Sequence, residues 1–66
     1  MKNSIKVERA KLNMTQTDLA VAVGVSKQTI NSIETGRFVP STVLAMKIAR
    51  FFKVSVESIF ELEPEE

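Results

Sequence analysis

The chain has 66 residues and a net charge of +1, contains neither cysteine nor histidine, and has no apolar run near the ~20 residues that span a bilayer. Its length allows one domain with a small core, and the missing residue types exclude disulfides, thiolate ligands, the commonest metal ligand and the commonest general base. We therefore expect a soluble cytoplasmic protein that is not an enzyme, has no membrane partner and needs no metal, cofactor or small-molecule ligand.

Five segments have the features of helices. In chain order they are about residues 3–12, 15–24, 26–36, 41–53 and 55–60. Apolar side chains at helical spacing predict the inward faces. Helix by helix, these side chains are Ile5 and Leu12 (with Arg9 between them); Leu19, Ala20 and Val23; Ile30 and Ile33; Leu44, Ile48, Phe51 and Phe52; and Ile59 and Phe60. The chain is thus predicted to be all-α, a compact five-helix domain with a short extended segment at Glu61–Glu63.

The ends of the helices are marked by capping residues. Side chains that can accept a hydrogen bond from the first turn stand at each start. They are Asn3 or Ser4, Thr15, Ser26, Ser41 and Ser55. Asp18, three residues after Thr15, completes a capping-box pattern. Residues suited to the left-handed conformation that ends a helix follow the first three segments. They are Asn13, Gly24 and Gly36.

The basic and acidic residues are unevenly distributed. Residues 1–53 carry nine basic and three acidic side chains, a balance of +6, whereas residues 54–66 carry five carboxylates and no basic group. This pattern fits a polyanion bound to the basic body, with the acidic segment at the remote end of the domain. A solvated surface with an acidic tail that aids solubility fits equally well.

Residues 15–34 combine two capped helices joined by about three residues around Gly24. Two short helices with so short a connection must cross steeply, which is the geometry of a helix-turn-helix. Ala20 suits the crossing point because a larger side chain would push the helices apart. The second helix buries only Ile30 and Ile33, so its polar face is free to dock elsewhere.

The stretch MTQTDLAVAVGVSKQTINSIETGRFVPS resembles the helix-turn-helix of the phage repressor and Cro family of transcriptional regulators. The matching residues are Thr15-Gln16, Leu19-Ala20, Gly24-Val25-Ser26, Gln28-Thr29-Ile30, Ile33-Glu34, Gly36-Arg37 and Pro40-Ser41. The continuation LAMKIARFFKVSVESIF matches small stand-alone members, so the resemblance covers nearly the whole chain. It implies a five-helix domain whose third helix enters the major groove of double-stranded operator DNA. Glu8 and Asn13 depart from the family pattern, which often has leucine and glycine there.

The resemblance also implies which residues touch DNA. Phosphate contacts are implied for Gln16, Ser26, Thr29, Arg37 and the backbone around Phe38, base contacts for Lys27, Gln28 and Ser32, and either kind for Asn31. The chemistry agrees, since a helix N-terminus favours an anion, lysine suits guanine and glutamine can pair with adenine. Ser26 caps its helix with or without DNA. For Arg9 and Glu34 the resemblance implies a structural ion pair between the first and third helices.

The leading hypothesis is a sequence-specific transcriptional regulator, a repressor that binds a palindromic operator as a homodimer. We expect Val39, Pro40, Val56 and Phe60 to join the two copies, because Val39 and Val56 have no evident place in so small a core. The alternative is an antitoxin-like protein-interaction module that also binds DNA. The polar third helix favours DNA, since a face that binds protein is richer in apolar and aromatic residues. A separate signal-sensing domain is not expected in a chain of this length.

Overall fold

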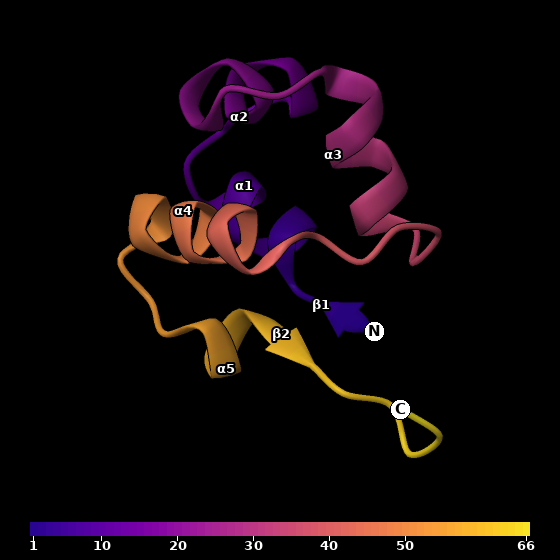
Figure 1. Cartoon of the computed structure of the whole chain (residues 1–66). Coiled ribbons are helices and arrows are strands. Elements are labelled where there is room, and N and C mark those ends of the chain that lie inside the picture. Colours follow the sequence, from indigo (N-terminus) through magenta and orange to yellow (C-terminus); the bar gives the residue numbers. More distant parts are fainter.

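The computed structural model describes all 66 residues and contains five helices and a two-stranded sheet. In chain order the elements are β1 (Lys2–Asn3), α1 (Ile5–Lys11), α2 (Gln16–Val23), α3 (Lys27–Glu34), α4 (Thr42–Phe52), α5 (Val56–Ile59) and β2 (Phe60–Glu61). Figure 1 shows α4 across the middle of the molecule, with α2 and α3 above it, α1 behind it, and α5 and the sheet below. None of the helices has the length and apolar character needed to cross a membrane.

The capping residues predicted from the sequence set most of the helix boundaries. The hydroxyls of four of them accept a backbone N–H three residues on at 3.0–3.2 Å, and these are Thr15, Ser26, Ser41 and Ser55. The Asp18 carboxylate in turn accepts the N–H of Thr15 at 3.0 Å, which completes the capping box. At α1 the side chain of Ser4 makes no capping bond, and the Asn3 side chain accepts the N–H of Ile5 at 3.2 Å instead.

Twelve buried hydrophobic residues form the core. Its most deeply buried large members are Ile5, Leu19, Ile30, Ile33 and Ile48. The inward faces predicted for α2, α3 and α5 are confirmed. The prediction for α1 is wrong at Leu12, whose side chain is 55% exposed because the helix ends at Lys11. On α4 the packed face is shifted by a fraction of a turn, so Ala45 and Ala49 are buried and Phe51 is exposed.

The two-stranded sheet corrects the all-α prediction. β1 pairs antiparallel with β2, with Lys2 opposite Glu61 and Asn3 opposite Phe60. The extended segment expected at Glu61–Glu63 is therefore a strand that begins at Phe60 and ends at Glu61. The pairing joins the two ends of the chain. It could not be foreseen because strands of two residues carry no periodic signal and their partners are far apart in the sequence.

Candidate nucleic-acid interface

The corner between α2 and α3 is fixed by backbone bonds. Gly24 has a φ of 77° and ends α2, and the N–H of Val25 then donates to the carbonyl of Ala20 at 3.0 Å. Ala20 itself is 2% exposed and lies on the buried face of α2. The side chain of Ser26 caps α3 directly after the turn. The chain therefore enters α3 in one defined direction, as the helix-turn-helix prediction requires.

One face of α3 is packed and the other is open. Ile30 and Ile33 are no more than 1% exposed, and they attach the helix to the core. The residues predicted to contact bases lie on other faces: Lys27, Gln28 and Asn31 are exposed and Ser32 is half-buried. Figure 1 shows α3 at the edge of the molecule, where no other element covers its outer side. A groove-binding helix needs this combination of a thin apolar stripe and an open polar face.

Five of the predicted contact residues line one shallow hollow at the start of α3. The hollow measures about 310 Å³, and its lining residues are Ser26, Gln28, Thr29, Ser32 and Phe38. The hydroxyls of Ser26 and Thr29 are 2.9 Å apart, and the Ser26 oxygen also accepts the N–H of Thr29 at 3.1 Å. Two hydroxyls beside a helix N-terminus form a neutral, hydrogen-bonding site with a favourable dipole, which suits a phosphate oxygen.

A largely buried ion pair holds the other end of α3. The Arg9 guanidinium donates to both carboxylate oxygens of Glu34, at 2.7 and 3.0 Å, and to the carbonyl of Met14 at 2.8 Å. The two paired side chains are 13% and 6% exposed. The hydrogen bond with Glu34 raises the pKa of Arg9. The predicted pair between α1 and α3 is confirmed, and it neutralises the only acidic residue of α3.

The amide of Gln16 joins the start of α2 to α3. Its Nε2 donates to Oε1 of Glu34 at 3.1 Å and to Oδ1 of Asn31 at 3.2 Å. Because a carboxylate can only accept hydrogen bonds, Glu34 fixes the Gln16 amide with its NH₂ group toward α3. The same NH₂ group in turn fixes the orientation of the Asn31 amide, whose oxygen accepts from it. The NH₂ group of Asn31 is then directed away as a free donor. Sequence reasoning gave Gln16 a phosphate contact but did not identify this chain of contacts.

The loop after α3 is closed by a Schellman arrangement. Gly36 has a φ of 78°, its N–H donates to Ile33, and the N–H of Arg37 donates to the carbonyl of Ser32 at 2.9 Å. The N–H of Phe38 reaches the same carbonyl at 3.2 Å. The side chains of Arg37 and Phe38 are exposed beyond this anchored turn. The Arg37 cation thus stands just past the helix, on a turn closed by three backbone hydrogen bonds.

The acidic end of the chain lies closer to α3 than predicted. Glu63 lines the same hollow as Glu34 and Gly36, at the C-terminal end of α3. The cause is the β1–β2 pairing, since the Asn3 amide donates to the carbonyl of Ile33 at 2.9 Å and carries the sheet to this end of the helix. The Met1 ammonium offsets part of the negative charge, with carboxylate oxygens of Glu66 at 3.1 Å and Glu63 at 3.5 Å.

The residues expected to join two copies differ in how accessible they are. Pro40 is buried and Phe60 is 7% exposed, so both pack inside the protomer. Val39 is 54% exposed and Val56 is half-buried. The surface that a second copy could contact at these positions is therefore supplied by the two valines.

Comparisons with known proteins agree with this geometry. A helix-turn-helix family model matches residues 5–59. An uncharacterized HTH-type transcriptional regulator of Methanocaldococcus jannaschii is 54% identical over 66 residues, which is 100% of both chains. The uncharacterized HTH-type transcriptional regulator YgzD of Bacillus subtilis is 45% identical over 98% of both chains. The solution structure of the SOS-response transcriptional repressor LexA from Eubacterium rectale matches 94% of this chain and 66% of that one, with a TM-score of 0.80 and 26% identity. The chain therefore belongs to the helix-turn-helix family of DNA-binding transcriptional regulators.

Proposed function

We propose that the protein is a sequence-specific repressor that binds a palindromic operator as a homodimer, with α3 in the major groove. The observation that carries the proposal is the division of α3, which buries only Ile30 and Ile33 and leaves polar side chains free along its outer side. Repression by occlusion of a promoter needs no activity beyond DNA binding. The similarity to a LexA domain, described as a transcriptional repressor, supports this assignment over activation.

In this proposal the contacts to DNA fall into two classes. Ser26, Thr29 and Arg37 hold phosphates, together with Gln16 and the backbone at Phe38, and these contacts position the helix without reading the sequence. Lys27 and Gln28 reach base edges from the first turn of α3, where lysine suits guanine and glutamine suits adenine. Asn31 and Ser32 continue the row one turn later.

The test begins with selection of bound duplexes from a random DNA pool, which supplies the operator. Gln28→Ala should then cost about 1–3 kcal/mol on the selected site and relax the preference at one base pair in each half-site. Arg37→Ala should weaken binding to selected and random duplexes alike, because a phosphate contact carries no base information. Lys6→Ala removes an exposed charge from α1 and is the control, with little expected change. Equal losses for Gln28→Ala on both kinds of duplex would remove Gln28 from the base-contacting set.

A further inference from the structure

A hollow of about 480 Å³, called here the α2–α4 hollow, lies between the end of α2 and the last turns of α4. Its lining residues include Val21 on α2 and Lys47, Arg50 and Phe51 on α4. Gln16, the proposed phosphate contact on α2, stands at the opposite end of that helix, and eight helical residues span about 12 Å. Figure 1 shows the last turns of α4 on the opposite side of the molecule from α3. The α2–α4 hollow is therefore separate from the proposed DNA-binding surface.

Two large apolar side chains of the hollow are exposed to water. Val21 is 77% exposed, more than any other large hydrophobic residue of the chain, and Phe51 is 37% exposed. The ring of Phe51 packs edge-on against the half-buried Phe52, with ring centroids 5.2 Å apart and planes at 79°. Because this contact already holds the Phe51 ring in place, the ring would lose little side-chain freedom when a partner covers it.

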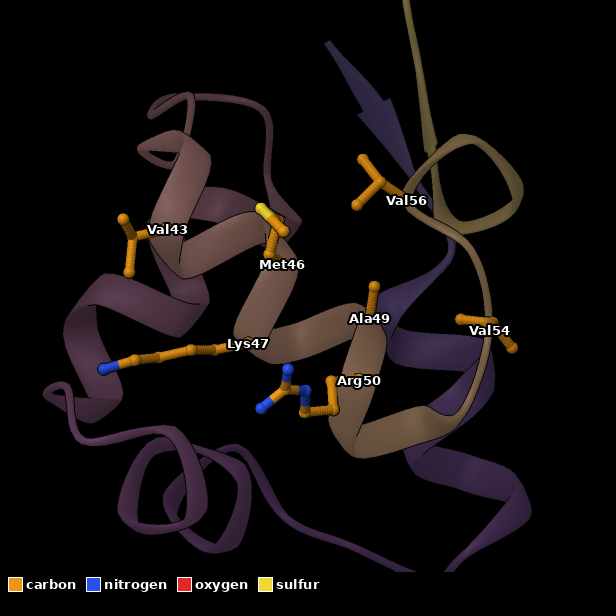
Figure 2. A pocket seen from close by; sticks show the side chains of 7 residues that line it. All are labelled: Val43, Met46, Lys47, Ala49, Arg50, Val54 and Val56. Carbon is orange, nitrogen blue, oxygen red and sulfur yellow. The ribbon is translucent and has the colours of Figure 1, made fainter.

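All the charge that lines the α2–α4 hollow is positive. Lys47 and Arg50 are exposed, and neither forms an ion pair within the chain. Figure 2, a close view of a neighbouring hollow on α4, shows both side chains extending from the helix away from Val56. The only acidic residue of α2, Asp18, lies in its first turn, where the carboxylate accepts the N–H of Thr15. A partner that carries carboxylates would therefore meet complementary charge in the hollow and no lining residue of its own sign.

We propose that the α2–α4 hollow binds an acidic amphipathic segment of a partner protein. An apolar side chain of the segment covers Val21 and Phe51, and two of its carboxylates pair with Lys47 and Arg50. These two cations are three residues apart on α4, a rise of about 4.5 Å, which matches carboxylates three or four residues apart on a partner helix. A nucleic acid would neutralise the cations but would leave Val21 without an apolar contact. The inference goes beyond the proposed function, because binding at this hollow needs no DNA.

Selection from a library of random peptides displayed on phage, with the full chain as bait, tests the surface. Peptides that also bind the Lys47→Glu, Arg50→Glu variant are removed, and the survivors should carry carboxylates three or four residues apart beside an apolar residue. In fluorescence anisotropy, their synthetic forms should bind this double variant about tenfold or more weakly than the wild type. Lys6→Glu is the charge control, since Lys6 is an exposed cation on α1, and it should bind like the wild type.

The apolar half of the proposal has its own variant. Val21→Ser should weaken binding of the surviving peptides about tenfold, because it removes most of the apolar surface that the partner covers on α2. Val7→Ser is the matched control, since Val7 is a helical valine on α1 that is 55% exposed, and it should leave the affinity unchanged. Thermal melting should show that all variants are folded.

An empty pool, survivors without carboxylates, or a Val21→Ser variant that binds as well as its control would overturn the proposal. Two other occupants are tested with the same variants. On a random-sequence duplex at low salt, Lys47→Glu should behave like Lys6→Glu, and a loss as large as that of Arg37→Glu would assign the cation to DNA instead. In sedimentation equilibrium, Val21→Ser should associate with itself as the wild type does, and a loss of self-association would assign the hollow to a second copy. Either result would overturn the proposal. The peptide assays contain no DNA, so a failure of the proposed function would leave their results unchanged.

Discussion

Removal of the Glu34 carboxylate should destabilise the protein far more than its distance from the centre of the core suggests. Glu34→Ala deletes the acceptor for two hydrogen bonds from Arg9, at 2.7 and 3.0 Å, and for one from Gln16 at 3.1 Å. Arg9 is only 13% exposed, so its charge would stay largely buried with the Met14 carbonyl as its remaining partner. Breaking a buried pair on one side costs about 3–5 kcal/mol.

We expect the lower end of that range, about 3 kcal/mol, because the guanidinium can still reach some water. A chain of 66 residues has a total stability of about 3–10 kcal/mol at about 0.05–0.15 kcal/mol per residue. The single substitution should therefore lower the urea midpoint by about 30% of its value or more. Circular dichroism during a urea titration measures this directly, provided that the slope of the transition is unchanged.

The double variant Arg9→Met, Glu34→Leu separates a buried unpaired charge from lost packing. With both charges replaced by apolar side chains of similar volume, stability should return to within about 1 kcal/mol of the wild type. Glu8→Ala is the control, because it breaks an i,i+3 pair with the 64% exposed Lys11 and should cost no more than about 0.5 kcal/mol. If Glu34→Ala cost as little as this control, the argument from burial would be refuted.

Three further predictions concern salt, pH and the turn after α3. Operator affinity should fall about a thousandfold between about 50 and 200 mM salt if the dimer neutralises about six phosphates, and fluorescence anisotropy that stays flat over this range would contradict the DNA-binding mode. The hydrogen bond from the Thr15 N–H lowers the pKa of Asp18, so the capping box stabilises the fold above the ordinary carboxyl pKa of about 4 and this contribution is lost as pH falls through the lowered value. The urea midpoints of the wild type and Asp18→Asn should therefore differ at neutral pH and converge in acid. Gly36→Ala should cost about 1 kcal/mol, since a residue with a φ of 78° is strained by a side chain even where nothing crowds it.

The parts of the fold that sequence reasoning predicted correctly are governed by contacts between near neighbours. A cap such as Ser26 needs only the N–H of Thr29, three residues away, and a terminator such as Gly24 needs only its own backbone freedom. The same holds for the apolar stripe of α3, which two isoleucines define. Such features depend on the local chain, so their residues can be recognised without knowing the tertiary structure.

The predictions that failed depend on packing between distant elements. Phe51 fits the stripe of α4 by spacing, but α4 is rotated so that Ala45 and Ala49 face the core, where small side chains allow close approach. Phe60 was expected both to face inward and to join two copies, and its 7% exposure in β2, which pairs with β1, agrees only with the first expectation. No periodicity in the sequence specifies how a helix is rotated against the core. Nor does any periodicity specify that the two ends of the chain pair with each other.

In the proposed complex, the hydrogen bonds of Gln16 connect its contact with a DNA phosphate to the contact of Asn31 with a base. Both N–H groups of its amide are used within the protein, one by Glu34 and one by Asn31. A phosphate offers only acceptors, so Gln16 can bind one only by giving up one of these bonds. The bond to Asn31 is the more exposed and the longer, at 3.2 Å, whereas the bond to Glu34 lies beside a largely buried ion pair. Release of the bond between Gln16 and Asn31 would free Asn31 to turn its amide toward a base. The phosphate contact of Gln16 at the start of α2 and the orientation of Asn31 on α3 would then change together.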